Sequence, residues 1–154
     1  MKQILLINFF FKTVLLYFCM FLITSSYSYA ENSCIKLRFN NNYKTEFNIS
    51  TSDTPQTRQK GLMFKKYLPE NEGMLFIWDK PRQRHMWMKN TYISLDMIFI
   101  KDDTIIGIIK NATPESLEIL TVEHPANKLL EINGGLADKY NLKKGDKFTC
   151  FTPF

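Results

Sequence analysis

The chain has 154 residues, of which 45% are hydrophobic and 23% are charged, and it contains three cysteines. This composition excludes a wholly disordered chain, a collagen-like chain and a small disulfide-dense scaffold. The formal net charge of +5 is too small to indicate a nucleic-acid-binding protein, so no nucleic-acid partner is expected. The length predicts one folded domain, with room for a targeting segment before it.

The first thirty residues have the order of a secretory signal peptide. Lys2 and Lys12 supply positive charge, residues 14–23 form an apolar core, and Ser28 and Ala30 are small residues at a cleavage site. We therefore expect cleavage after Ala30 and export to the periplasm or the extracellular space. The alternative is an uncleaved anchor, which would be the protein's only attachment to a membrane. Against it, the uninterrupted apolar run is shorter than the roughly 20 residues that a spanning helix needs.

The next part of the chain predicts a hairpin and a short helix. Apolar residues alternate with polar residues over 35–39 and again over 45–49, which indicates two half-buried strands. The asparagines at 40–42 suit a tight turn between them, because asparagine tolerates the left-handed backbone conformation. The threonine–proline pair at 54–55 is a helix-start signal, and we expect a short helix that ends near Leu62.

The rest of the chain predicts short strands separated by turns. Residues 74–78 are continuously apolar, which indicates a strand covered on both faces, and Pro81, Arg82 and Arg84 are expected to form a loop after it. Further strands are expected over 85–89, 95–100, 105–109, 129–132 and 148–151, with a short helix over 136–140. Residues 31–154 are therefore predicted to form a single, mainly β domain, a sandwich or barrel with one or two short helices.

Three motifs carry a family resemblance. They are RQKGLMF at 58–64, GMLF at 73–76, and WMKNT at 87–91 followed by LDMIFI at 95–100. Their order and spacing resemble the domain-of-unknown-function 192 family, an ancient conserved region, over roughly residues 43–150. The resemblance implies a compact, jelly-roll-like β domain that is often exported, and it implies no established reaction. The turn at 102–104 lacks the glycine that the family often has there.

Trp87, Lys89 and Asn90, in the third motif, are candidate ligand-binding residues. If residues 85–89 form a strand, Trp87 and Lys89 share one face. A tryptophan beside a lysine could stack on a sugar ring and donate a hydrogen bond to it. The alternative is that Trp87 packs in the core and Lys89 is a solvated surface charge.

Two carboxylates lie within otherwise apolar predicted strands, Asp96 in 95–100 and Glu131 in 129–132. A buried carboxylate must find hydrogen-bond donors or raise its pKa. Asp96 and Glu131 are candidates for a catalytic acid and base pair of the kind that glycoside hydrolysis requires. The alternative for Asp96 is a buried polar clip that fixes a loop between two strands. The residues expected to converge on one ligand site are Arg58, Trp87, Lys89, Asn90, Asp96 and Glu131.

Two cysteines, Cys34 and Cys150, would remain after cleavage of the signal. We expect them to form a disulfide, because exported proteins meet an oxidising compartment. One observation opposes this pairing: Cys34 shares the strand parity of the polar Lys36 and Arg38. The bond therefore requires the strand pattern to fray at Cys34, or the strand to lie at an edge of the sheet.

No metal and no cofactor are expected. His85 and His124 are not at metal-ligand spacing, and the chain has no glycine-rich phosphate loop and no nucleophile-elbow serine. The methionines of the motifs alternate with large apolar residues, which favours core packing over copper binding.

The sequence favours an envelope protein that binds a glycan or another small polar ligand, as a binding or accessory module. The alternatives are a carboxylate-dependent hydrolase that acts on an envelope glycan, and a structural partner of another envelope protein. A close pair of desolvated carboxylates in an open cleft would favour the hydrolase, whereas carboxylates held separately by backbone donors would favour the other two classes.

Overall fold

The structure, a computed structural model, describes residues 34–41, 43 and 45–152. The predicted signal peptide lies outside the described residues. Within this part of the chain, no helix is long and apolar enough to cross a membrane.

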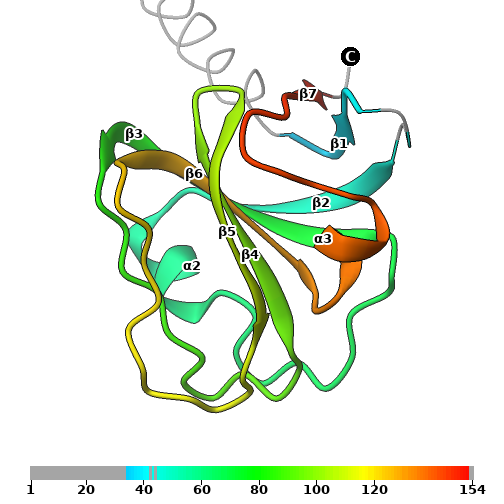
Figure 1. Ribbon diagram of the computed structural model, residues 1–154. Helices are drawn as coiled ribbons and strands as arrows, with labels where there is room; N and C mark the ends of the chain where they lie inside the picture. Colours follow the sequence, from blue (N-terminus) through cyan, green and yellow to red (C-terminus); the bar gives the residue numbers. More distant parts are fainter. Residues whose placement is uncertain (1–33, 42, 44, 153–154) are drawn as a thin grey trace, which may run out of the picture. The chain divides into compact units, whose positions relative to one another are not determined.

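Seven strands form one curled sheet in the order β5-β4-β6-β3-β2-β1-β7 (Figure 1). Their bounds are β1 Lys36–Phe39, β2 Glu46–Ser52, β3 Glu72–Arg82, β4 Leu95–Lys101, β5 Thr104–Ala112, β6 Ala126–Asn133 and β7 Phe148–Phe151. Neighbouring strands pair antiparallel except β2 and β3, which are parallel. Two short helices, α2 (Pro55–Lys60) and α3 (Leu136–Lys139), complete the described fold. The prediction of a mainly β fold with one or two short helices is confirmed.

The parallel pairing of β2 and β3 explains the place of α2. Parallel neighbours need a crossover connection, and α2 lies in that connection. Thr54 caps the helix: its side chain accepts a hydrogen bond from the Thr57 backbone amide, and the Thr57 side chain accepts one from the Thr54 amide. Pro55 occupies the first turn, where its missing N–H costs nothing. The predicted helix start is confirmed.

The sheet buries apolar side chains on both faces. One face, which we call the α3 face, includes Leu75, Ile98 and Leu130 and is covered in part by Leu136 and Ala137 of α3. The other, which we call the α2 face, includes the residues next to these in sequence, Phe76, Met97, Phe99 and Leu129, together with Leu62 just after α2. Because side chains alternate along a strand, β3, β4 and β6 contribute to both cores, as their apolar runs predicted.

Two local predictions are wrong. Residues 85–89 form no strand in the structure and make only an isolated bridge, between Met86 and Leu120. The expected loop at Pro81 and Arg82 is instead the end of β3, although the pairing there is irregular. The alternating pattern at 85–89 therefore results from a loop segment that packs Met86 and Met88 onto the α2 face.

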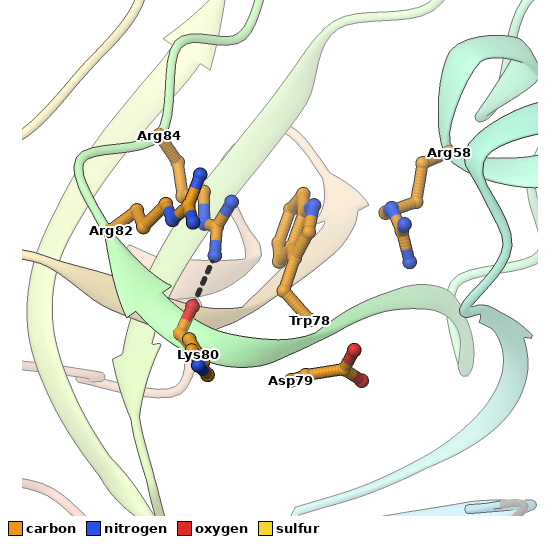
Figure 2. A pocket seen from close by; sticks show the side chains of 6 residues that line it. All are labelled: Arg58, Trp78, Asp79, Lys80, Arg82 and Arg84. Atoms are coloured by element: carbon orange, nitrogen blue, oxygen red, sulfur yellow. Dashed lines mark hydrogen bonds between the residues drawn. The ribbon is translucent and has the colours of Figure 1, made fainter.

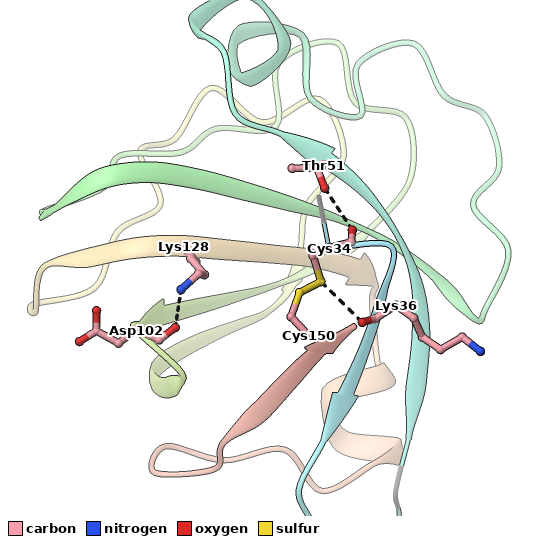
Figure 3. Close-up of a disulfide and its surroundings, with 6 residues drawn as sticks. All are labelled: Cys34, Lys36, Thr51, Asp102, Lys128 and Cys150. Carbon is pink, nitrogen blue, oxygen red and sulfur yellow. Dashed lines mark hydrogen bonds between the residues drawn. A yellow bond between two sulfur atoms is a disulfide. The ribbon is translucent and has the colours of Figure 1, made fainter. Parts of the chain in front are cut away.

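A disulfide joins Cys34 to Cys150, with their Cα atoms 5.5 Å apart (Figure 3). This separation is within the usual range for the bond. Cys34 is buried and precedes β1, which begins at Lys36, so the strand parity that opposed the pairing does not apply to it. Cys150 is in β7, beside Leu37 of β1. Ile35 also precedes β1 and is 48% exposed, so the alternation over 35–39 does not place it with the buried Leu37 and Phe39.

Candidate functional site

The two predicted site carboxylates lie on opposite faces of the sheet. Their strands, β4 and β6, are neighbours, and Asp96 pairs with Ile132 while Met97 pairs with Glu131. Ile132 belongs to the α3 face and Met97 to the α2 face, so the two carboxylates point away from each other. The prediction of a catalytic acid and base pair is therefore wrong. The two carboxyl groups of a glycosidase must flank the same glycosidic bond, and these two lie on opposite faces of the sheet.

Asp96 is held as a structural clip. It is fully buried; its Oδ1 accepts a hydrogen bond from the Asn111 amide at 2.8 Å, and its Oδ2 accepts one from the Ala137 amide at 2.7 Å. Asn111 has a φ of 52°, and α3 has no side-chain cap of its own. The Asp96 carboxylate therefore fixes an irregular part of β5 and the start of α3 to β4.

Glu131 is buried without a partner. It is 4% exposed, it lies between Met74 of β3 and Met97 of β4, and none of the described residues forms a hydrogen bond or ion pair with its carboxylate. Burial raises the pKa of this carboxyl to about 8, because the charged form loses its hydration. Glu131 is therefore protonated at neutral pH.

Trp87, Lys89 and Asn90 lie in the loop between β3 and β4. Trp87 is 43% exposed, and the Lys89 Nζ lies 5.1 Å from the centre of its ring. Asn90 has a φ of 54°, and its carbonyl accepts a hydrogen bond from the Phe64 amide. Lys89 thus contacts Trp87, and Asn90 contacts Phe64, whereas Asp96 lies on the opposite, α3 face of the sheet.

Arg58 does not pair with either carboxylate. Its Nη1 donates to the Asp53 carbonyl and, at 2.8 Å, to the Ile77 carbonyl. The expected convergence of six residues on one site is therefore wrong. The register of β4 against β6, which the sequence did not specify, places the two carboxylates on different faces.

Arg58 instead belongs to a basic pocket at an irregularity of β3. The regular pairing of β3 with β6 stops at Ile77 and resumes at Arg82, so residues 78–81 stand opposite Asn127 alone. Pro81, which has no N–H to donate to a ladder, suits such a bulge. Six residues line the pocket, which has a volume of about 330 Å³: Arg58, Trp78, Asp79, Lys80, Arg82 and Arg84 (Figure 2).

Backbone carbonyls and an aromatic ring position the arginines. Arg84 donates from Nε to the Ala126 carbonyl at 3.0 Å and from Nη2 to the Lys80 carbonyl at 2.5 Å. Its guanidinium lies 4.3 Å from the centre of the Trp78 ring, and that of Arg58 lies 5.7 Å from it. Trp78 thus stands between two cations, as Figure 2 shows. Its ring orients them and leaves little aromatic surface for a sugar.

The positive charge of the pocket is not neutralised by carboxylates. Within the described residues, no ion pair involves Arg58, Arg82 or Arg84. Asp79 also lines the pocket, and Figure 2 shows its carboxylate pointing away from Arg82 and Arg84; it forms no ion pair with Arg58. Burial lowers the pKa of Arg84, and the charges of Arg82 and Arg58 lower it further. A guanidinium nevertheless stays charged in proteins, so the pocket retains its positive charge.

Sequence reasoning identified Arg58 but missed the other residues of this pocket. A usable signal was the density of positive charge at 80–84, next to an apolar strand that ends in tryptophan. The bulge that turns these side chains toward α2 depends on the pairing of β3 with β6, which composition and periodicity do not specify.

Metal-ligand residues do not gather in the described part of the chain. It contains no group of three or more His, Cys, Asp or Glu side chains that could hold a metal ion.

The curled seven-stranded sheet and its basic pocket define a small, mainly β domain, and two solved structures share this architecture. A protein of unknown function from Novosphingobium aromaticivorans DSM 12444 is 35% identical, with a TM-score of 0.71 over 74% of this chain and 83% of its own. A "putative transcription regulator" from Sinorhizobium meliloti 1021 is 34% identical, with a TM-score of 0.72 over 78% of this chain and 97% of its own.

The family model DUF192, described as Uncharacterized ACR, COG1430, matches residues 36–150. The chain therefore belongs to the DUF192 family, as its three motifs predicted. No curated protein matches the chain.

Proposed function

We propose that this protein is a binding module for a small anionic ligand, which enters the basic pocket. One observation carries the proposal: backbone carbonyls and Trp78, and not carboxylates, orient Arg58 and Arg84. Carbonyls fix a guanidinium without cancelling its charge, so N–H donors remain for a ligand. Such preorganised donors bind anions well, because little side-chain freedom is lost on binding.

The chemistry of the pocket favours a phosphate or carboxylate group. Arg58, Lys80, Arg82 and Arg84 carry four positive charges against the single negative charge of Asp79. Guanidinium groups present pairs of N–H donors that match the oxygens of either anion. The volume of about 330 Å³ leaves space for a small organic body attached to that group.

A thermal-shift screen with phosphate, sulfate, citrate and acetate tests this proposal. Phosphate or a carboxylate should raise the melting temperature, since a ligand that binds only the folded state stabilises it. Arg82→Ala should reduce the affinity by about tenfold or more, because it removes charge-assisted hydrogen bonds. Lys144→Ala, an exposed cation outside the pocket, is the matched control. An equal rise in melting temperature for the unchanged protein, Arg82→Ala and Lys144→Ala would contradict a site at this pocket.

A glycan at Trp87 is a second candidate, supported by the exposure of that ring. Lys89 already lies against the ring, so a sugar would have to bind beside it or displace it. Trp87→Ala should then weaken retention on an immobilised envelope glycan, and Arg82→Ala should not. Retention that is the same for Trp87→Ala and the unchanged protein would exclude this candidate.

We also propose that the protein acts after export from the cytoplasm. The signal-like order of residues 1–30 supports this, and a disulfide suits an oxidising compartment. Intact-mass analysis of the envelope fraction should find a chain that begins at Glu31. A mature protein that still begins at Met1 would contradict cleavage.

A further inference from the structure

A second pocket, which we call the α2 pocket, lies along another side of helix α2. Its volume is about 420 Å³. Thr57, Lys60 and Gly61 line it from α2 and the residue after the helix, and their spacing of three and four places them on one side of the helix. Arg58, which belongs to the basic pocket, does not line it. The two pockets therefore have different walls.

A buried hydroxyl without a partner lines the α2 pocket. Ser52, the last residue of β2, is fully buried, and no described residue forms a hydrogen bond with its Oγ. Its strand partner is Phe76, so the two residues share the α2 face. Buried hydroxyls nearly always have a hydrogen-bond partner, and one that lacks it within the protein can be satisfied by an oxygen that enters the pocket.

The rim of the α2 pocket has an unusual backbone. Phe64 has a φ of 66°, which is uncommon for a bulky side chain, and Gly61 has a φ of 47°. The Phe64 amide donates to the Asn90 carbonyl at 2.8 Å, and the Phe64 ring contacts Tyr92 edge-on. These contacts hold Phe64 at the rim although its side chain is 59% exposed. Strained residues of this kind cluster at ligand sites.

The strain involves the family motifs directly. A side chain at Gly61 would bring its Cβ to 3.1 Å from the Phe76 ring, so the turn after α2 requires glycine both for its φ and for space. The first motif thus supplies Gly61 and Phe64, and the third supplies Asn90. The basic pocket includes only Arg58 of these motifs, whereas five motif residues line the α2 pocket: Lys60, Gly61, Met63, Phe64 and Met74.

The lining of this pocket is amphipathic. Met63, Phe64 and Met74 provide apolar surface, while Lys60 and Lys65 provide positive charge. We infer that the α2 pocket binds a small amphipathic carboxylate, such as a medium-chain fatty acid. The apolar body packs on the methionines and Phe64. The carboxylate accepts a hydrogen bond from Ser52 and is neutralised by the lysines.

A titration of the ¹⁵N-labelled full chain with sodium octanoate, followed by amide NMR, tests this inference. The amides of residues 57–65, Ser52 and Met74 should shift, and those of residues 78–84 should not. Octanol, which has the same body without the charge, should bind at least about tenfold more weakly, because it cannot pair with the lysines. Shifts confined to residues 78–84, or no shifts at all, would overturn the inference.

Two variants test the polar contacts without endangering the fold. Ser52→Ala removes a hydroxyl that has no partner in the described structure, so it should fold normally and bind octanoate about five- to tenfold more weakly. Lys60→Ala, an exposed change, should act in the same direction. Arg82→Ala should leave octanoate binding unchanged, which separates this site from the basic pocket. Unchanged affinity in both Ser52→Ala and Lys60→Ala would contradict the assignment.

Discussion

At the scale of single residues, the two buried carboxyl groups on neighbouring strands β4 and β6 differ in their hydrogen bonding. Asp96 has a backbone N–H for each oxygen, and Glu131 has no donor among the described residues. The environment of each carboxyl group therefore determines its role: Asp96 is a structural clip held by backbone amides, and Glu131 is a neutral member of the α2-face core at neutral pH.

Glu131 makes the stability of the protein fall as pH rises. Its folded pKa, about 8, lies above the unfolded value, so between about pH 5 and 8 the folded state holds a proton that the unfolded state releases. The free energy of unfolding should fall there by up to about 1.4 kcal/mol per pH unit from this residue. Glu131→Gln should remove that slope and be the more stable protein at pH 8.

Urea unfolding at pH 5, 6.5 and 8 measures this effect. Glu46, Glu70 and Asp103 are partnered, and their lowered pKa values place their titration below this window, so they do not mask it. Equal pH slopes for Glu131→Gln and the unchanged protein would show that Glu131 is not the buried neutral acid described here.

Asp96→Asn tests the clip. An amide group can accept only through its one oxygen, so the N–H of either Asn111 or Ala137 loses its acceptor. The expected loss of stability is about 1–3 kcal/mol, measured by urea unfolding at pH 7. Asp138→Asn, which breaks an exposed pair with Lys110, should cost less than about 1 kcal/mol and serves as the control. Equal costs in the two variants would contradict a structural role for Asp96.

At the scale of elements, the sequence predicted those strands and helix ends that depend on neighbouring residues alone. The alternation over 45–49 and the threonine–proline start of α2 each correspond to an observed element. The strand expected at 85–89 failed because alternation also arises when a loop buries every second residue against a core. The basic pocket was not predicted, because it depends on the irregular pairing of β3 with β6.

The cap of α2 links helix stability to the site. Thr54→Ala removes the capping hydroxyl and should cost about 1 kcal/mol in thermal or urea unfolding, whereas Thr54→Ser should keep most of that stability. Arg58 lies in this helix, so Thr54→Ala should also weaken anion binding at the basic pocket. Anion affinity that is equal in the alanine and serine variants would show that the cap does not position Arg58.

At the scale of the whole described domain, the disulfide links the first described residue, Cys34, to the last strand, β7. Cys34 and Cys150 are separated by 116 residues, and β1 pairs with β7 beside them. In the chain-entropy account, removing a cross-link of this span costs about 4 kcal/mol. The double variant Cys34→Ala/Cys150→Ala should show that loss in urea unfolding, relative to the unchanged protein without reductant. A loss below about 1 kcal/mol would mean that the bond contributes little.

The central claim is that the basic pocket binds a small anion through its arginines, and their side-chain Nε–Hε signals in ¹⁵N NMR test it most directly. In a titration with inorganic phosphate or citrate, the signals of Arg58, Arg82 and Arg84 should move together and saturate. The signal of Arg38, which is already paired with Glu46, should stay in place. Uniform small movement of all four signals, or movement of Arg38 alone, would contradict the claim.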